Sequence, residues 1–550
     1  MDHTRGSWIP ESLNPSGYQT LLDVISSHCQ RYADKPAFTS FGRTLSYGEL
    51  DRLANSFAVY LQKETNLQPG DRIAIQLPNL IQYPIALFGA MRAGLVIVNT
   101  NPLYTPRELE HQFVDSGAKA LIIHASMAHN AEKIIDKTSI EHIFVTQVGD
   151  LHGFLKRTLI NAAIKYVKKM EPAYDLPLEQ PLREALLKYE GEMPTPVTVN
   201  TSDTAVLQYT GGTTGVSKGA VLTHGNLISN MLQGRELISR AKEGWSETAI
   251  SPLPLYHIYA FTLSLVIMED GGHSVLIANP RDIPGFVKEL NSWQPTTFIG
   301  LNTLFVALCN NEGFAGVDFS KLIITISGGM ALTHAAADTW RKSTGCEIME
   351  GYGLTETSPA VAINPPDAIA VGTIGWPLAE TDVAIIGTDG KPVEAGTPGD
   401  LCVKGPQVMQ GYWQRDDATA ASFTDDGYLI TGDVAVQDDD GRLRIVDRAK
   451  DLIIVSGFNV YPNEIEDVVT SHEGVVECAA IGVKDERCGE VPKLYVVRKD
   501  TNLDEKTIIR WCKERLTNYK VPRQIEFVDD LPKSNVGKVL RRMLKDTPAS

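Results

Sequence analysis

The chain has 550 residues, of which 43% are hydrophobic and 21% charged, so it is long enough for about three or four domain-sized units of a globular protein. Its formal net charge of −16 argues against a general nucleic-acid surface, because such a surface needs a basic face. The seven cysteines stand singly, without a C-x-x-C pair. They predict reduced, buried thiols in a cytosolic protein, and neither a zinc site nor a disulfide framework. The first fifteen residues contain no apolar run, so we expect no secretory signal there.

Short apolar runs alternate with helical segments along most of the chain. Buried strands are predicted at 72–77, 95–99 and 120–124, and helices at 81–93 and 106–116. The alternation returns between 204 and about 348, which predicts α/β layers with largely parallel sheets. The fold class is therefore α/β.

The pattern of predicted elements changes after residue 371. Short β-rich runs separated by Gly, Pro and Asp turns predict a small distorted β-barrel over about 371–447. The residues from 451 onward mix strands and helices as a separate α+β domain. The expected organisation is a large N-terminal domain over 1–447, made of two α/β layered subdomains and the barrel, followed by a mobile C-terminal domain over 451–550.

One uncharged, largely apolar segment has a composition similar to that of a membrane-spanning helix. Residues 248–268 carry no Asp, Glu, Lys or Arg, but Pro252 and Pro254 interrupt the start. The remaining apolar part, from Leu255 to Met268, is too short for a bilayer core of ~30 Å. We therefore expect a buried helix.

The segment 154–170 (FLKRTLINAAIKYVKKM) is basic within an acidic protein. It holds five Lys or Arg residues and no acid, and its apolar residues share one helical face. Such a helix can lie on an anionic membrane surface. The alternative, a solvated helix that covers the large domain, has about equal weight.

The loop at 209–219 (YTGGTTGVSKG) is suited to a polyphosphate. Glycines let several backbone N–H groups face one anion, while the hydroxyls add donors and the lysine adds positive charge. The loop lies between two apolar runs, which favours a tight turn between strands over a flexible linker. It matches neither the Walker A nor the Rossmann pattern. The candidate ligands are Tyr209, Thr210, Gly211, Gly212, Thr213, Thr214, Gly215, Ser217, Lys218 and Gly219.

This loop closely resembles the phosphate loop of the adenylate-forming enzymes, which include acyl-CoA synthetases, luciferases and peptide-synthetase adenylation domains. Four further segments match the same superfamily in order: PLPLYHIYAF at 252–261, GYGLTETSP at 351–359, DDGYLITGDV at 425–434 with the run to Glu466, and LPKSNVGKVLRR at 531–542. The segments at 101–112, 279–290 and 455–469 are similar to those of bacterial long-chain fatty acyl-CoA synthetases of the β-oxidation type.

The resemblance implies a nucleotide site with ATP and Mg²⁺. In GYGLTET, Glu356 is implied as the Mg²⁺ ligand, Thr355 as a phosphate contact and Tyr352, beside Gly353, as the adenine stack. Asp433 would accept hydrogen bonds from the ribose, and Arg448 would bind ribose or phosphate. From the residues alone, a surface glutamate, a turn aspartate and a surface ion pair remain the alternatives. Lys218 would help to place pyrophosphate.

The resemblance also implies which residues take part in catalysis and which form the hinge of the small domain. Lys538 would bridge the substrate carboxylate and the α-phosphate, although a solvated lysine in a basic tail is the plainer interpretation. Lys450, within 448–450, would be the hinge about which the small domain rotates. Ser456, Gly457 and Phe458 would then guide the CoA thiol. His257 would position the carboxylate at the mouth of the acyl pocket, with a core histidine as the alternative. The helix after His257 and the segment 298–305 are candidate pocket walls.

The expected function is ATP-dependent activation of a long-chain fatty acid to acyl-AMP, followed by thioester formation with CoA. An acyl-AMP ligase that loads a carrier protein is one alternative, but the hinge region lacks an insertion typical of such enzymes. A medium-chain or aryl acid ligase and a non-catalytic protein of this fold are the others. We expect a cytosolic protein with peripheral contact to the inner membrane face and no nucleic-acid partner. Homodimers occur in the family, and no self-complementary feature of the sequence indicates one.

Overall fold

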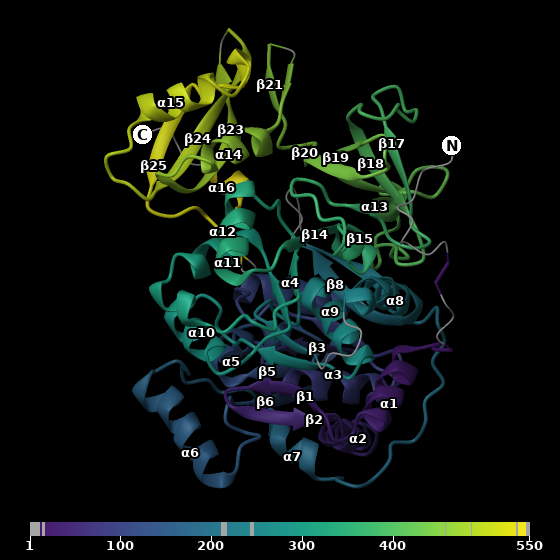
Figure 1. Cartoon of the computed structure of the whole chain (residues 1–550). Helices are drawn as coiled ribbons and strands as arrows, with labels where there is room; N and C mark the ends of the chain where they lie inside the picture. The colour runs from purple at the N-terminus through teal and green to yellow at the C-terminus, as the bar shows by residue number, and fades with distance from the viewer. Residues whose placement is uncertain are drawn as a thin grey trace.

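Two large sheets and two smaller ones organise the chain, with the smaller ones above the larger in Figure 1. The computed structural model describes residues 12–13, 17–210, 217–241, 247–456, 458–485, 487–534 and 537–545, without the side chains of 239–241.

The first large sheet has nine strands, in the spatial order β16-β15-β14-β13-β12-β10-β11-β1-β2. Its central pairs are parallel, and antiparallel pairs extend it at both edges. In that order the strands are Trp376–Pro377, Ala360–Ile363, Ile348–Gly353, Ile324–Ser327, Thr297–Gly300, Thr248–Ser251, His273–Leu276, Pro36–Ser40 and Arg43–Ser46. The N-terminal hairpin therefore pairs with a strand more than 200 residues away.

The second large sheet has seven strands, in the order β7-β6-β5-β3-β4-β8-β9. All its pairs are parallel except β8 with β9, which form the hairpin of the predicted phosphate loop. In that order the strands are Glu179–Pro181, His142–Thr146, Ala118–His124, Arg72–Gln76, Val96–Asn99, Thr204–Thr210 and Lys218–Thr223. The predicted strands at 72–77, 95–99 and 120–124 are confirmed, with ends that differ by at most two residues.

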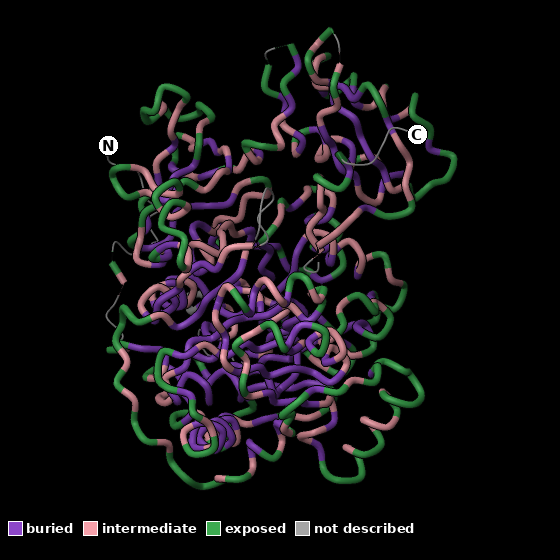
Figure 2. Tube along the Cα trace, turned by 180° about the vertical axis from the view of Figure 1, so that it is seen from behind, coloured by how far each residue is buried: buried purple, intermediate pink, exposed green. Residues whose placement is uncertain are grey.

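Helices cover and separate the large sheets. Helix α3 is buried along its whole length and packs closely on α2. Figure 2 shows that the buried parts of the chain are concentrated in this lower region. The helices of the large domain are α1 Leu21–Arg31, α2 Tyr47–Glu64, α3 Gln82–Arg92, α4 Pro106–Ser116, α5 Ala128–Glu132, α6 Phe154–Ala162, α7 Leu182–Leu187, α8 His224–Ala241, α9 Ile258–Glu269, α10 Ile283–Leu290, α11 Asn302–Cys309, α12 His334–Thr344 and α13 Asp416–Ala420.

Helix α4 shows why its bounds were readable from the sequence. Thr105 and Glu108 form a capping box at its start, and Pro106 occupies the first helical position. Gly117 ends the helix in the left-handed conformation at φ +60°, where a side chain is disfavoured. The predicted range 106–116 is therefore the observed one.

The β-rich segment forms a four-stranded antiparallel sheet in the order β17-β18-β19-β20. Its strands are Asp382–Ile386, Gly399–Lys404, Leu429–Gln437 and Leu443–Arg448. The C-terminal domain follows as an α+β unit with its own apolar core. Its strands are β21 Ile453–Val455, β22 Phe458–Val460, β23 Val475–Asp485, β24 Gly489–Arg498 and β25 Gln524–Val528, and its helices are α14 Pro462–Thr470, α15 Glu505–Lys513 and α16 Arg541–Lys545.

The two unusual helical segments have different environments. Helix α9, predicted at 255–268, is buried on most sides as expected. The basic segment is helical but leaves no residue buried: α6 is followed by a π-helical turn at Ala163–Val167. Figure 1 shows α6 at the edge of the large domain, far from the small domain. Within the described part of the chain, no helix combines the length and the apolar character needed to cross a membrane.

Replacing Trp340 by alanine is expected to destabilise the large domain. The indole is fully buried, and its ring centroid lies 4.7 Å from that of Phe305 and 4.9 Å from that of Phe298. Removal of such a side chain leaves a cavity that costs about 3–5 kcal/mol. The midpoint of thermal unfolding should fall by several degrees. Leu103→Ala, at a site 54% exposed, is the control and should leave the midpoint near wild type.

Candidate active site

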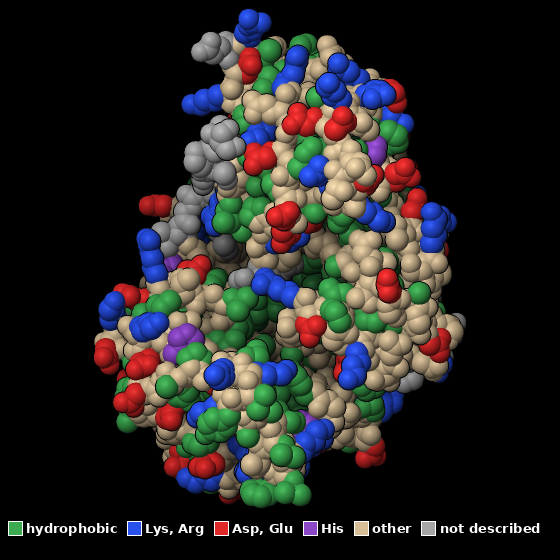
Figure 3. Space-filling model, turned by 90° about the vertical axis from the view of Figure 1, so that its left-hand side faces the viewer, with side chains coloured by type: hydrophobic (Ala, Val, Ile, Leu, Met, Phe, Trp, Pro, Cys, Tyr) green, Lys and Arg blue, Asp and Glu red, His purple; other side chains and the backbone are tan. Residues whose placement is uncertain are grey.

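A cavity of about 2540 Å³ lies between the large and small domains, at the ends of several strands of both large sheets. Strands β8 and β14 both lead into it, so the phosphate loop and the GYGLTET segment meet there, as the carboxyl ends of parallel strands commonly do at ligand sites. The space-filling view in Figure 3 shows the molecule hollowed at this level.

The described flanks of the phosphate loop line the cavity. Thr210 pairs with Lys218 at the loop end of the β8–β9 hairpin, and both residues line the cavity with Ser217. The Oγ of Ser217 is buried without a partner among the described residues. Five predicted ligands, Gly211, Gly212, Thr213, Thr214 and Gly215, lie outside the described residues.

Tyr209 and Gly219 support the loop. The hydroxyl of Tyr209 donates to Asp115 Oδ2 at 2.7 Å, so this polar group is committed to the protein. The ring also lies over Gly219, where a Cβ would approach Tyr209 Cε2 to 3.0 Å. Gly219 therefore provides space for the ring, and Tyr209 lines the cavity.

Glu356 and Lys218 are linked through Tyr412, which the sequence analysis missed. The hydroxyl of Tyr412 donates to Glu356 Oε1 at 2.7 Å, and Lys218 Nζ lies 4.9 Å from the centre of the Tyr412 ring. Thr355, beside Glu356 in a short 3-10 turn, also lines the cavity. The carboxylate of Glu356, the hydroxyl of Thr355 and the ammonium group of Lys218 all line this cavity. Among the described residues no group of three or more His, Cys, Asp or Glu side chains is placed so that it could hold a metal ion by itself.

Tyr352, Asp433 and Arg448 come together from three strands. The hydroxyl of Tyr352 donates to Asp433 Oδ2 at 2.6 Å, and Arg448 Nε lies 3.2 Å from Asp433 Oδ1. Burial, and then the charge of Asp433, raise the pKa of Tyr352 well above its ordinary value. Gly353 allows the turn beyond Tyr352, because a Cβ there would collide with the carbonyl oxygen of Pro359. All four predicted ligands line one wall of the cavity.

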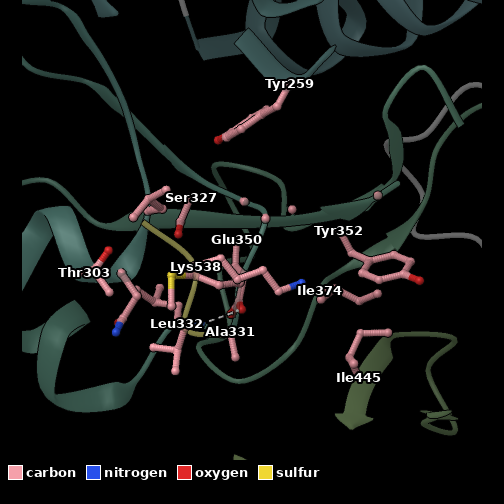
Figure 4. A pocket seen from close by; sticks show the side chains of 18 of the residues that line it. Tyr259, Thr303, Ser327, Ala331, Leu332, Glu350, Tyr352, Ile374, Ile445 and Lys538 are labelled. Carbon is pink, nitrogen blue, oxygen red and sulfur yellow. Dashed lines mark hydrogen bonds between the residues drawn. The ribbon is translucent and has the colours of Figure 1, made fainter. Parts of the chain in front are cut away.

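Lys538 reaches the cavity from the small domain. Thr303 on α11 donates through its Oγ1 to the carbonyl oxygen of Gly537 at 3.2 Å, which holds the lysine segment against the large domain. Figure 4 shows Lys538 in the pocket that Glu350 and Tyr352 also line. Burial, followed by the charge of Arg448, lowers the pKa of Lys538 to about 8. The lysine is therefore not a solvated tail residue.

His257 stands at the start of α9, where its Nδ1 accepts from the backbone N–H of Tyr259 at 3.3 Å. Burial, and then the nearby charge of Lys538, lower the pKa of His257 to about 4, so the ring is neutral near pH 7. It lines the cavity close to Lys538.

An apolar groove between α8 and α9 leads away from His257. It is lined by Leu263 and Val266 on α9 and by Gly234, Leu237 and Ile238 on α8. From His257 to Val266 the helix rises about 14 Å, and residues at both ends of this span line the cavity. Of the other predicted wall, Leu301, Thr303 and Phe305 line the cavity, whereas Phe298 packs in the Trp340 cluster.

Glu350 is a second cavity residue that sequence reasoning missed. Its Oε1 accepts from the backbone N–H of Leu332 at 3.0 Å, and its Oε2 is buried without a partner among the described residues. Burial raises the pKa of Glu350 to about 8, so the carboxyl group is mostly neutral at pH 7. Its position directly before GYGLTET was visible in the sequence, but nothing there indicated its burial.

The hinge region and the predicted CoA path lie on opposite sides of the domain boundary. Lys450 lines the outer part of the cavity. Ser456 and Phe458 lie on the exposed β21–β22 hairpin, where Phe458 is 57% exposed and stacks on Tyr519. Figure 1 shows β21 at the top of the small domain, and neither Ser456 nor Phe458 lines the cavity that Lys538 enters. Gly457 lies outside the described residues.

Comparison with known proteins places this site in a family. The model of the AMP-binding enzyme family matches residues 25–413, and that of the AMP-binding enzyme C-terminal domain matches 464–538. A long-chain-fatty-acid–CoA ligase of Escherichia coli O157:H7 is 50% identical, over 98% of this chain and 96% of the relative. One from Bacillus subtilis is 34% identical over 98% and 96%.

Solved structures agree with the sequence comparisons. ATP-bound MatB from Rhodopseudomonas palustris superposes with a TM-score of 0.82 at 29% identity, covering 96% of this chain and 98% of that one. The fold, the five ordered motifs and the matched relatives lead to one conclusion. The chain belongs to the AMP-binding enzyme family.

Proposed function

We propose that this chain is an ATP-dependent long-chain-fatty-acid–CoA ligase that forms an acyl-adenylate and then a CoA thioester. One observation carries the proposal: Lys538 enters the cavity at the point where His257 and the apolar groove meet the wall formed by Tyr352 and Asp433. Relatives named for this activity match almost the whole chain.

The reaction follows from two exchanges of bonds. A carboxylate oxygen of the fatty acid attacks the α-phosphorus of ATP, the bond from that phosphorus to the bridging oxygen breaks, and pyrophosphate leaves. The CoA sulfur then attacks the acyl carbon, the acyl carbon–oxygen bond breaks, AMP leaves, and the thiol proton passes to the medium. The first step gathers negative charge at phosphorus, so it requires preorganised positive groups.

The cavity residues suit these steps. Lys538 would lie between the substrate carboxylate and the α-phosphate, and neutral His257 would orient the carboxylate without adding charge. Thr355, Thr210, Ser217 and Lys218 would bind the phosphates, and Asp433 with Arg448 would bind the ribose beside the Tyr352 ring. Glu356 would hold Mg²⁺, which commonly uses one or two carboxylates plus phosphate and water, and the cation would offset phosphate charge.

Glu350 would form hydrogen bonds with the adenine base of ATP. A neutral carboxyl group can donate a hydrogen bond to a ring nitrogen or accept one from an amino group, and Oε2 has no protein partner among the described residues. Glu350→Ala should weaken ATP binding about 10-fold, the equivalent of ~1.4 kcal/mol.

The pH dependence tests this role of Glu350 directly. In a Lys538→Met background, which removes the other group with a pKa near 8, ATP affinity should fall as pH rises through about 8, because Glu350 ionises. Adding Glu350→Gln keeps the side chain neutral and should abolish that fall. Isothermal titration with ATP and GTP between pH 6 and 9 measures both effects. An identical pH profile with and without the Glu350→Gln change would contradict the assignment.

We also propose that the domains are 1–447 and 451–550, joined by a hinge at 448–450 in which Lys450 absorbs the rotation. In this mechanism Lys538 would occupy the position next to the acyl carbon that the CoA sulfur must reach. Thioester formation therefore requires the small domain to move, and rotation would carry Ser456, Gly457 and Phe458 toward the cavity.

The substrate test is pyrophosphate and AMP release across saturated acids from acetate to C18 and one benzoate, with and without CoA. The proposal expects turnover with C12–C18 acids that depends on CoA. Acyl-AMP that accumulates and does not react with CoA would instead indicate a carrier-loading ligase. Activity confined to medium-chain or aryl acids would keep the chemistry and change the substrate.

Peripheral contact with the inner membrane face is proposed for the segment 154–170. Phe154, Leu155, Leu159, Tyr166 and Val167 are 70–80% exposed on it, beside five basic side chains. An exposed apolar face flanked by Lys and Arg fits an anionic lipid surface.

Changing the five basic residues Lys156, Arg157, Lys165, Lys168 and Lys169 to glutamine should weaken binding to phosphatidylglycerol-rich vesicles at least 10-fold, since each contributes up to ~1 kcal/mol. Vesicle sedimentation measures it. A control with the same charge change uses the exposed residues Lys288, Lys484, Lys506, Arg510 and Lys513. Equal loss of vesicle binding in both variants would show that net charge alone causes the effect. That result would contradict the proposed membrane surface at 154–170. A homodimer, which occurs in the family, is checked by light scattering in the same preparations.

A further inference from the structure

The domain boundary contains a buried ionic contact that none of the assigned roles uses. Asp447, the last residue but one of β20, belongs to the large domain and has a fully buried side chain. Arg541 begins α16 in the small domain, three residues after Lys538, and its side chain is 16% exposed. Their charged groups approach to 3.5 Å, from Arg541 Nη1 to Asp447 Oδ1.

Arg541 is held in place by the small domain itself. Its Nη2 donates to Asn463 Oδ1 at 2.7 Å and to Glu466 Oε2 at 2.8 Å, both on α14. Its Nε donates to Glu466 Oε1 at 3.2 Å. Because Asn463 and Glu466 move with Arg541, these bonds would persist if the small domain rotated, and the bond to Asp447 would not.

Asp447 accepts a second contact across the boundary. The backbone N–H of Asn463 donates to Asp447 Oδ2 at 3.0 Å, and the Asn463 amide donates to the carbonyl oxygen of Val446 at 3.3 Å. A further bond to Asp447, from the N–H of Arg448 to Oδ1 at 2.8 Å, lies within the hinge strand. The contacts that join this carboxylate to another segment, from Arg541 and from Asn463, therefore both come from the small domain.

This arrangement makes the burial of Asp447 depend on the orientation of the small domain. Burial raises the pKa of Asp447 to about 6, and the charge of Arg541 opposes that rise. A buried carboxylate that loses its counter-charge is costly, whereas an exposed one is not. Removing Arg541 should thus disfavour the orientation seen here more than an orientation in which Asp447 meets water.

We propose that Asp447 and Arg541 form an interdomain latch that selects the orientation in which Lys538 lies in the cavity. Both are positioning residues: neither touches the reacting atoms, and both act through the placement of Lys538. The inference rests on the proposed rotation about Lys450. It predicts that the latch favours adenylate formation and must open before CoA reacts.

The test separates the two half-reactions. Adenylate formation is measured by ATP–pyrophosphate exchange with palmitate and no CoA, and thioester formation by reaction of synthetic palmitoyl-AMP with CoA. Arg541→Gln should lower exchange at least 10-fold and leave the second rate unchanged or faster. Arg510→Gln, the same change at an exposed site on α15, should leave both rates unchanged.

A second variant tests the charge argument. In Arg541→Gln with Asp447→Asn, the buried carboxylate that lost its partner is neutral, so exchange should recover part of the loss. Equal losses in both half-reactions, or no recovery in the double variant, would overturn the latch in favour of a general structural role.

Hydrogen–deuterium exchange keeps the latch testable apart from the proposed function. In the latch model Arg541→Gln increases deuterium uptake in peptides that contain Arg448 and Asn463, whose amides donate to Asp447, but not in peptides from the second large sheet. Unchanged uptake at these amides contradicts the latch. A wild-type enzyme without exchange activity on any acid would contradict the proposed function instead.

Discussion

Lys538→Ala is expected to lower the rate of acyl-adenylate formation by roughly 10²–10³-fold, the usual loss when one preorganised charge-stabilising group is removed from an active site. The side chain is buried in the cavity near Arg448 and Asp433. It could therefore stabilise charge at the α-phosphate at little reorganisation cost. Thioester formation from supplied acyl-AMP should stay close to wild type, because the proposed rotation takes Lys538 out of the cavity for that step.

The pH dependence of adenylate formation should follow the titration of Lys538. The pKa of Lys538 is lowered to about 8, so the charged form is lost as pH rises through that value. The kcat/KM of the exchange reaction should fall above pH 8, since kcat/KM reports groups of the free enzyme. In a Glu350→Gln background, which removes the ionisation of Glu350 near the same pH, Lys538→Arg keeps its charge to much higher pH and should flatten this limb at a lower rate.

Two comparisons make the Lys538 prediction specific. Lys513→Ala changes an exposed lysine of the same domain and should alter neither half-reaction. Equal loss of adenylate and thioester formation in Lys538→Ala would show that the lysine supports the fold of the small domain, contrary to the proposed role.

The parts of the fold that could be predicted from the sequence are those marked by residues within the same element. The bounds of α4 were predictable because Thr105 and Pro106 mark its start and Gly117 marks its end, each through local geometry. The buried strands of the seven-stranded sheet followed from short apolar runs. The pairing of β1 with β11 did not, because neither strand carries a mark of its partner. The π-helical turn after α6 also lacked a sequence signal.

The residues of the site also fall into two groups, those that sequence motifs predicted and those that only the fold reveals. Lys538, Tyr352 and Asp433 were placed by motifs, and the structure brings them to one cavity. Glu350 and Tyr412 were missed because their roles depend on tertiary packing: Glu350 is neutral only where burial raises its pKa, and Tyr412 reaches Glu356 from 56 residues away. The sequence gives no sign of the partners of Arg541, because only the fold brings Asp447 and Glu466 to it.

Glu356→Gln is expected to reduce Mg²⁺-dependent adenylate formation by about 10²-fold, because the amide keeps the volume and loses the anionic oxygen that a hard cation prefers. The hydrogen bond from the Tyr412 hydroxyl at 2.7 Å can persist on the amide oxygen, so the turn at 355–357 should remain folded. The exchange rate is measured as a function of Mg²⁺ concentration. The variant should need a higher concentration for half-maximal rate.

The control for Glu356 is Glu347→Gln, the same change at an exposed residue just before β14. It should leave the Mg²⁺ dependence unaltered. A Glu356→Gln enzyme with a lower maximal rate but an unchanged Mg²⁺ requirement would place the cation elsewhere and leave Glu356 as a support for Tyr412. The two outcomes differ because a ligand changes metal affinity, whereas a support for Tyr412 changes the position of Lys218, whose Nζ lies 4.9 Å from the Tyr412 ring centre.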